Sequence, residues 1–464
     1  MRESSEIPEN DTIPDLIDAV PPAPNFAGKK LRGPQIAALT GFSSWFDGDE
    51  QNEGSIKMGH VIIPMGSGKT ALGVLFAKEA IEKTGQKVLV LSWSNNTAQG
   101  FYTACTDHMS ANPSSHLIPD LALGGRKADA SANFIVSNFT ATNNWPDLSE
   151  VGLILVDEAD INGLSLNRSA GLTAIARDFG IPIVALSATD QLASRKCIEE
   201  VFPDELIYMG MPNSLIPLRE QGLVPEMDFY DIELKANIQI SASGEEISDE
   251  ETGTLLGQGW NRQILDFYET HIRGKTPAPK TAFIYKNNSL LEDLISQAEK
   301  RGIKLAKLTG DEDQADFERI KADLESGAID GVAGSRKLGR GTDIPCIDTV
   351  FDSQLTKSPQ LFWQGKGRAF RLNYRQEDKR CALYNFIPCE VTVENKGPAD
   401  KHEGPLTHGS YFDPNYYDRN RKTGRSTSLR GSAHYRLDNL TDIRSSREVM
   451  QEKRDYRGKP PDFI

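Results

Sequence analysis

Side chains that could bind and activate phosphate groups gather in the stretch VIIPMGSGKT, at positions 61–70. Its turn is made by Gly66, Ser67 and Gly68, and Lys69 and Thr70 follow directly. Glycines allow backbone N–H groups to close around phosphate oxygens at the start of a helix. In this setting the lysine would reach the β- and γ-phosphates, and the threonine hydroxyl would ligate Mg²⁺. The general pattern has a further glycine five residues before Gly68, where this chain has Ile63.

A second group of chemically capable residues is the acidic run DEAD at 157–160, which follows the apolar residues 152–156. Two carboxylates at the end of a buried strand are costly unless a cation lies beside them. Asp157 is therefore expected to hold Mg²⁺ together with Thr70. The adjacent Glu158 is expected to orient or deprotonate an attacking water.

A pair of arginines completes the candidate catalytic set. The stretch QGKGRAFR at 364–371 predicts the front of a helix, on which Arg368 and Arg371 lie three residues apart and share a face. Two guanidinium groups converging on a γ-phosphate would neutralise the charge that grows on it during transfer. This chemistry requires a nucleotide that is presented by another part of the chain.

The elements that must position these groups are short apolar runs, which alternate with helix-like segments. Buried parallel strands are predicted at 61–63, 87–92, 133–137, 152–156 and 182–187, and again at 281–285, 303–308, 329–333 and 347–351. Alternation of this kind predicts an α/β protein with two parallel sheets flanked by helices. Ligands of such sheets bind beyond the carboxyl ends of the strands, where the glycine turn and the acidic run both stand.

Composition narrows the class of protein further. The 464 residues include 52 basic and 66 acidic side chains, a net charge of −14, which excludes a wholly basic nucleic-acid-coating protein but allows a local basic groove. Five scattered cysteines without CxxC spacing fit a reducing compartment. No apolar run has the length of a membrane span and no signal segment is visible. We expect a soluble, cytoplasmic protein, with nucleoid or nuclear association left open.

Six segments, taken in order, resemble the motifs of superfamily 2 helicases and translocases over roughly residues 29–390. They are LRxxQ, PMGSGKT, DEAD, SAT, GRGTDIP and QGKGRAFR. The resemblance implies two tandem RecA-like domains with ATP and Mg²⁺ in the cleft between them. It also implies that Arg368 and Arg371 reach the nucleotide when this cleft closes.

The same resemblance assigns further nucleotide contacts. Gln35, in LRxxQ, would read the adenine edge, because its amide can donate and accept hydrogen bonds together. Gly341 and Asp343 stand in the segment that touches nucleotide and nucleic acid, and Gln364 opens the last motif. The tripeptide SAT at 187–189 would couple hydrolysis to domain closure. Polar residues after two strands, Ser94–Asn96 and Asn138, could hydrogen-bond a phosphate backbone.

The nucleic acid implied is DNA rather than RNA. DEAD-box RNA helicases show Pro-Thr-Arg-Glu-Leu after the second strand and a histidine where Gln364 stands, and both are missing here. The motif style is closer to the DNA translocases of restriction and repair, which implies an ATP-dependent helicase or translocase. Two alternatives stay open: an RNA-dependent ATPase that remodels RNA–protein complexes, and an ATP-switched interaction subunit of a DNA-processing complex. Protein partners would supply nuclease activity or specificity.

The sequence suggests the following division of the chain. We expect a flexible lead at 1–27, a first RecA-like domain at 28–212, a bridge at 213–279, a second RecA-like domain at 280–390 and a tail at 391–464. In the tail, arginines alternate with aromatic residues. This pattern fits a segment along a nucleic-acid backbone, or a polar and partly disordered end.

Overall fold

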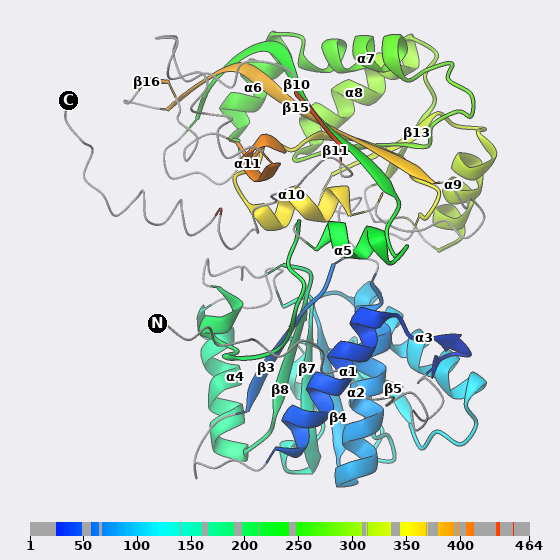
Figure 1. Cartoon of the computed structure of the whole chain (residues 1–464), viewed down its shortest axis with the longest axis vertical. Coiled ribbons are helices and arrows are strands. Elements are labelled where there is room, and N and C mark those ends of the chain that lie inside the picture. Colours follow the sequence, from blue (N-terminus) through cyan, green and yellow to red (C-terminus); the bar gives the residue numbers. More distant parts are fainter. Residues whose placement is uncertain are drawn as a thin grey trace, which may run out of the picture.

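The structure is a computed structural model of the 464-residue chain. The residues that it describes are 25–48, 57–64, 67–139, 141–159, 166–189, 197–212, 214–240, 247–308, 312, 314–335, 344–367, 369, 379–393, 397–398, 405–412, 433–436 and 449. They form two lobes, each built on one large sheet, and the lobes are stacked in Figure 1. We call the described residues up to 212 the first lobe and those from 214 onward the second lobe.

The sheet of the first lobe has seven described strands, all parallel. They are β3 (Met58–Ile62), β4 (Lys87–Ser92), β5 (Pro119–Leu121), β6 (Phe134–Asn138), β7 (Val151–Asp157), β8 (Ile183–Ser187) and β9 (Asp204–Tyr208). Their order across the sheet is β5-β6-β4-β7-β8-β3-β9. Every residue of β3, β7 and β8 is buried, which explains why these strands read as continuous apolar runs.

Helices cover both faces of this sheet. Those of the first lobe are α1 (Gly33–Asp47), α2 (Lys69–Thr84), α3 (Asn95–Ala111) and α4 (Leu166–Phe179). The first three pack on one face, where Phe42 of α1 stacks on Phe76 of α2 with ring centroids 4.2 Å apart. Helix α4 packs on the other face through Leu172 and Ala176. Smaller elements are the β1 (Asn25–Phe26) and β2 (Lys29–Lys30) hairpin and 3-10 turns at Thr142–Asn144, Leu148–Glu150 and Ile198–Glu200.

The sheet of the second lobe is mostly parallel. Its described strands are β10 (Glu226–Ile240), β11 (Thr281–Tyr285), β12 (Leu305–Leu308), β13 (Gly331–Gly334), β14 (Thr349–Ser353), β15 (Arg380–Val393), β16 (Gly397–Pro398) and β17 (Ala433–Arg436). The order is β12-β13-β11-β14-β15-β10-β17, with β16 paired to β15. Only the short β16 and β17 pair antiparallel within this described sheet.

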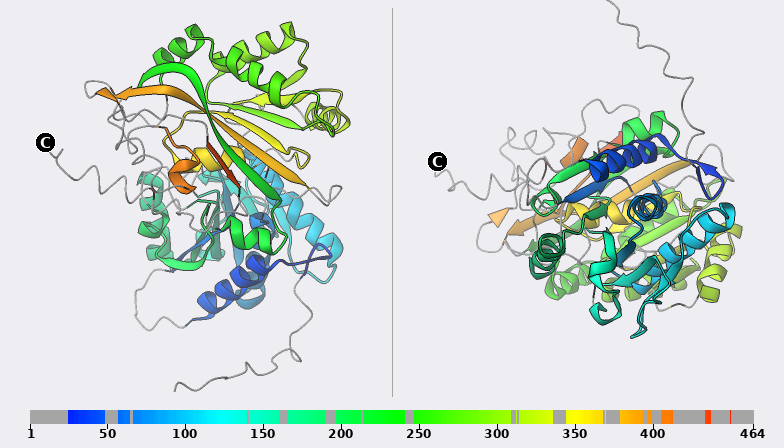
Figure 2. Two further views of the ribbon diagram at one scale, coloured as in Figure 1. Left: turned by 45° about the horizontal axis from the view of Figure 1, so that its top comes forward. Right: turned by 90° about the horizontal axis from the view of Figure 1, so that it is seen from below.

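The helices of the second lobe also lie on both faces of their sheet. They are α5 (Leu215–Glu220), α6 (Asp249–Gly257), α7 (Trp260–His271), α8 (Asn288–Lys300), α9 (Gln314–Ser326), α10 (Pro359–Lys366) and α11 (Gly409–Phe412). Figures 1 and 2 show α7 and α8 on the outer side and α10 and α11 on the side nearer the first lobe. The two core clusters divide in the same way. The predicted fold class, two parallel sheets flanked by helices, is confirmed.

The expected bridge at 213–279 needs correction. Its residues supply β10, α6 and α7, and β10 pairs in parallel with β15 along most of its length. This strand was missed because its buried residues alternate with acidic and amide side chains, unlike the continuous apolar runs elsewhere. The helicase-like sheet therefore includes chain on both sides of the expected second domain.

Part of the expected tail is also integrated into the second lobe. Tyr411 and Phe412 of α11 are buried against Phe362 and Trp363 of α10. The buried Asp231 carboxylate of β10 accepts the N–H groups of His408 and Gly409, each at 2.9 Å. Burial alone would raise the pKa of Asp231, but His408 and these two N–H groups outweigh it and hold the pKa below its usual range.

Loss of this carboxylate should destabilise the lobe. Asp231→Asn places an amide N–H₂ where one oxygen now accepts a backbone N–H, so a buried donor loses its partner. We expect the free energy of unfolding to fall by about 2 kcal/mol. Urea unfolding measures the change, and Asp228→Asn is the matched control on the same strand, because Asp228 is partly exposed beside His434 and Arg436. Equal effects of the two changes would contradict the buried-cap role.

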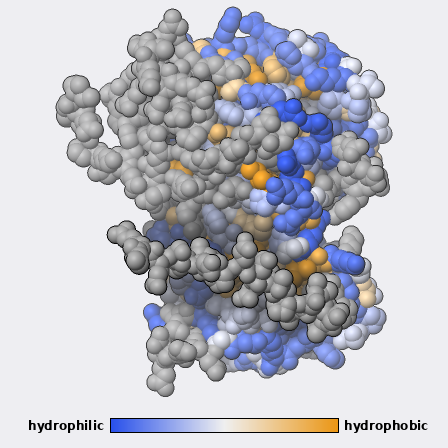
Figure 3. All heavy atoms as spheres, viewed as in Figure 1, coloured by the Kyte–Doolittle hydropathy of each residue, from blue (hydrophilic) through white to orange (hydrophobic). Residues whose placement is uncertain are grey.

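The described surface is mainly hydrophilic. Figure 3 shows polar side chains over most of the visible described face, with apolar ones in small patches. Among the described residues, none of the helices combines the length and the apolarity that crossing a bilayer requires. The hydrophobic side chains are instead gathered in the clusters on the two sides of each sheet.

Candidate functional site

The phosphate loop joins β3 to α2, as the sequence predicted. Helix α2 begins at Lys69, and Gly68 caps it with a backbone φ of +87°, in the left-handed region that favours glycine. A β-carbon at Gly68 would lie only 2.3 Å from Nε2 of Gln35, so any other residue would displace that side chain. Ser67 is buried, and Gly66 lies outside the described residues.

Gln35 lies against this loop although 30 or more residues separate the two in sequence. It stands in the first turn of α1, where Pro34 favours a helix start, and its side chain is 7% exposed. Its Oε1 accepts the backbone N–H of Arg32 at 2.9 Å, which fixes the amide orientation. The structure therefore brings together the glutamine and the glycine turn that the sequence analysis singled out separately.

Lys69 and Thr70 occupy the first turn of α2, and both are half-buried. The Lys69 ammonium donates to the backbone carbonyl of Ile63 at 3.4 Å, so its side chain folds back over the end of β3. The helix N-terminus adds its own positive partial charge at this place. Together these groups make an electropositive turn suited to phosphate oxygens.

The acidic pair stands at the same edge of the sheet. Asp157 is the last residue of β7, pairs with Leu186 of β8 and is 6% exposed. Strand β8 is in turn the neighbour of β3, so one strand separates the carboxylate from the phosphate loop. A carboxylate and a threonine hydroxyl at one sheet edge are oxygen donors of the kind that Mg²⁺ prefers.

Glu158 has an unusual backbone conformation. Its φ is +47°, in the left-handed region that non-glycine residues rarely adopt. The following residue, Ala159, donates its N–H to the carbonyl of Leu186 at 3.1 Å, which ties the turn to β8. Conformations of this kind cost on the order of 1 kcal/mol and cluster at functional sites. The strain fits a carboxylate held in a defined place.

The SAT segment connects these two parts of the site. The Ser187 hydroxyl donates to the carbonyl of Thr189 at 2.5 Å and accepts the N–H of Thr189 at 3.1 Å, and all three residues are buried. The carbonyl of Ser187 also accepts the N–H of Ile63, directly before the phosphate loop, at 3.1 Å. A shift of this turn would thus be transmitted to the loop.

The second lobe supplies fewer of the predicted residues. Gln364 is buried in α10, but it lies near the end of this helix and not at its front, which corrects the prediction. The helix begins earlier because Ser358 caps it, accepting the N–H of Leu361 at 3.4 Å, and Pro359 occupies the first turn. The predictions for Gly341, Asp343, Arg368 and Arg371 lie outside the described residues.

Lys366, inside the last motif, has a role that sequence analysis missed. Its ammonium is fully buried, forms an ion pair with Asp352 of β14 and lies 3.4 Å from the ring centroid of Phe362. Burial lowers the pKa of Lys366, and the Asp352 carboxylate opposes that shift. The pair attaches α10 to its sheet. Only the tertiary contact identifies it, since fourteen positions separate the two residues.

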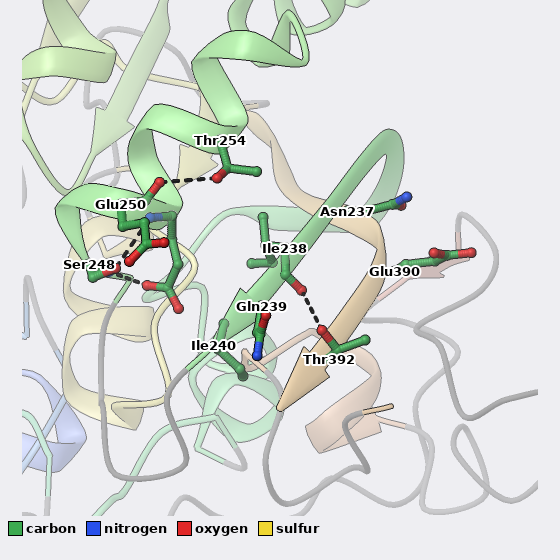
Figure 4. A pocket seen from close by; sticks show the side chains of 10 residues that line it. Asn237, Ile238, Gln239, Ile240, Ser248, Glu250, Thr254, Glu390 and Thr392 are labelled. Carbon is green, nitrogen blue, oxygen red and sulfur yellow. Dashed lines mark hydrogen bonds between the residues drawn. The ribbon is translucent and has the colours of Figure 1, made fainter. Parts of the chain in front are cut away.

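A groove on the second lobe is a poor candidate for the nucleotide. It has a volume of about 540 Å³ and lies between α6 and the far ends of β10 and β15 (Figure 4). Glu250, Glu251 and Glu390 line it, and carboxylates would repel a triphosphate. It contains none of the residues that the sequence analysis selected. The chemically suitable place is the carboxyl edge of the first sheet.

Comparison with known protein families defines the class. Residues 264–373 match the family described as the helicase conserved C-terminal domain. This match covers α7 to the end of α10, in the second lobe, whereas the phosphate loop and the acidic pair lie in the first. The chain contains a superfamily 2 helicase core.

Individual relatives are distant. The Saccharomyces cerevisiae protein described as "Putative ATP-dependent helicase IRC3" is 22% identical over 245 residues, which are 52% of this chain and 34% of that protein. The chain thus matches about a third of the length of this curated relative. A fragment of a "putative HsdR subunit of a type I restriction enzyme" from Vibrio vulnificus has the same fold, with a TM-score of 0.51, 13% identity, and coverage of 79% of this chain and 69% of that one. Dbp5 of S. cerevisiae, bound to RNA and ADP BeF3, gives a TM-score of 0.47 and 13% identity, covering 79% and 94%.

Proposed function

We propose that this protein is an ATP-dependent nucleic-acid helicase or translocase, with DNA as its preferred track. One observation carries the proposal: Gln35, the phosphate loop and the Asp157–Glu158 pair converge at one edge of the first sheet. That edge faces the second lobe, because α5 follows β9 and lies at the boundary of the lobes (Figure 1). Met209, directly after β9, packs against cores of both lobes.

ATP and Mg²⁺ are the cofactors that these residues fit. The left-handed Gly68 leaves room that a side chain would fill, and the helix start and Lys69 are suited to phosphate charge. In the proposal Gln35 contacts the adenine, and Ser67, Gly66 and Gly68 wrap the phosphates. Thr70 and Asp157 hold the metal ion, whose charge would stabilise the transferring phosphoryl group.

The reaction proposed is hydrolysis of the γ-phosphate. Glu158 holds or deprotonates the attacking water. Arg368 and Arg371 would compensate the developing charge from the second lobe, with Gln364, Gly341 and Asp343 as further contacts on that side. Closing and opening of the lobes would convert each hydrolysis into a step along a strand gripped through its phosphates. Such a grip is largely independent of base sequence and depends strongly on salt.

The decisive experiment compares the ATPase rate of the full chain with single-stranded DNA, duplex DNA and RNA of equal length at fixed salt. The proposal predicts stimulation by nucleic acid, with DNA the stronger activator. Stimulation by RNA alone would favour the RNA-remodelling alternative. A rate that no nucleic acid changes would contradict the motor and leave an ATP-operated switch. A strand-displacement assay then separates unwinding from movement without unwinding.

A further inference from the structure

An arginine–aromatic cluster lies at the carboxyl edge of the first sheet, away from the phosphate loop. Trp93 directly follows β4, Phe139 directly follows β6, and Arg168 stands in the first turn of α4. The guanidinium carbon of Arg168 is 5.2 Å from the Trp93 ring centroid and 6.0 Å from that of Phe139. Both distances are within the range of cation–π attraction. We call these three residues the Trp93 cluster.

The Trp93 cluster is placed at the site edge by strand pairing. Ser92 and Asn138, the last residues of β4 and β6, are register partners, so the chain leaves both strands at the same level. Strand β4 is also the neighbour of β7, which carries Asp157. The order β6-β4-β7-β8-β3 therefore sets the cluster on one side of Asp157 and the phosphate loop on the other. A ligand on the cluster would lie alongside the nucleotide site without occupying it.

Solvent exposure distinguishes this cluster from the aromatic packing inside the lobes. Trp93, Phe139 and Arg168 are all half-buried, whereas Phe42 and Phe76 are fully buried. An apolar ring held by a cation at the protein surface keeps a defined orientation while part of it stays in water. Such a ring can stack on another flat π-system at a low cost in conformational entropy.

Polar groups next to the Trp93 cluster suit a phosphate backbone. Ser94 begins the α3 helix, with its hydroxyl accepting the Thr97 N–H at 3.2 Å, so the positive end of a long helix points to this edge. Exposed Asn95 accepts the side-chain amide of Asn138 at 3.1 Å, which brings two amide side chains beside the rings. Cation, rings, amides and a helix start together form the combination that binds single strands.

We propose that Trp93 is a base-stacking residue for single-stranded nucleic acid, positioned by Arg168. The inference rests on the proposed function and names one contact of its nucleic-acid site. The ring would take a base of any identity, because every base has a π-face. A single strand is favoured over a duplex because bases in a duplex are already stacked on one another. The amides of Asn95 and Asn138 would contact the adjoining phosphates.

The test measures the Kd of the full chain for a fluorescently labelled single-stranded oligothymidylate and for a duplex of equal length. Trp93→Ala should weaken single-strand binding roughly 10- to 100-fold. The slope of log Kd against log salt should stay unchanged, because no charge is removed. Trp93→Phe should retain most of the affinity, since it keeps a ring. The matched control is Trp45→Ala: Trp45 is also half-buried, but its indole donates to Asp204 at 2.9 Å, at the opposite edge of the same sheet.

A second readout uses the intrinsic fluorescence of tryptophan. Unlabelled oligothymidylate should quench the wild-type emission clearly more than that of Trp93→Phe, which checks the contact in a variant that keeps an aromatic ring. Equal quenching, or a Trp93→Ala protein that binds single strands as tightly as the wild type, would overturn this inference while the helicase proposal stands. A wild-type chain that binds no nucleic acid would instead reject the proposed function itself. Equal weakening of duplex binding would also overturn the stacking role.

Discussion

Glu158→Gln should lower the kcat of nucleic-acid-stimulated ATP hydrolysis by roughly 10²- to 10⁴-fold. Glutamine has nearly the same shape but cannot take a proton from the attacking water, so ATP should still bind. Steady-state hydrolysis at saturating nucleic acid gives kcat, and a fluorescent ATP analogue gives the affinity for nucleotide. A large loss of kcat with retained binding would place Glu158 in the chemical step.

The control for this change is Glu150→Gln. Glu150 stands directly before β7, at the opposite end of the strand that carries Asp157, and forms an exposed ion pair with Lys87 at 2.6 Å. Its removal should leave hydrolysis close to the wild-type rate. Unchanged turnover in Glu158→Gln would reject the assignment of the acidic pair. The left-handed backbone of Glu158 would then need another explanation.

Lys69→Ala is expected to lower kcat/KM for ATP by roughly 10²- to 10³-fold or more. The lysine supplies a full positive charge at the start of α2, where the backbone can offer only partial charges. Unlike the change at Glu158, this one should weaken nucleotide binding as well as turnover, because the ammonium would contact the phosphates in the ground state. Isothermal titration with ATP–Mg²⁺ and steady-state kinetics separate the two effects.

Lys78→Ala is the matched control for Lys69, because it removes a lysine from the same helix. Lys78 pairs with Glu82 at 2.6 Å on the outer surface of α2, far along the helix from its first turn. Surface pairs of this kind contribute little to stability, so the variant should fold and hydrolyse ATP normally. If Lys69→Ala hydrolysed ATP at the wild-type rate, the phosphate-loop assignment would be wrong.

The arrangement of the first sheet accounts for the economy of the site. Parallel strands bring all their carboxyl ends to one edge, so residues far apart in sequence meet there without long connecting loops. The phosphate loop, the SAT turn and Asp157 leave three adjacent strands at that edge. The Trp93 cluster leaves the next two strands, which places a candidate base contact in the same row.

Local sequence was sufficient where the physical signal is itself local. Strands buried on both faces are continuous apolar runs, so β4 and β11 were predicted with their observed limits. The start of α2 at Lys69 followed from a glycine turn that no regular element can contain. The residues able to hold ATP and Mg²⁺ could be selected for the same reason, because each stands next to such a strand.

Tertiary structure decided the features that depend on partners distant in the chain. Strand β10 alternates buried and exposed residues, and only its pairing with β15 makes it part of the second sheet. Likewise, no local pattern places Gln35 against Gly68, pairs Lys366 with Asp352 or brings Arg168 to Trp93. A buried charge or a half-buried ring is stable only through the group that packs against it, and that group is chosen by the fold. The sequence by itself thus determined the strands, the phosphate loop and the class of chemistry, whereas the packing of the lobes determined which side chains work together.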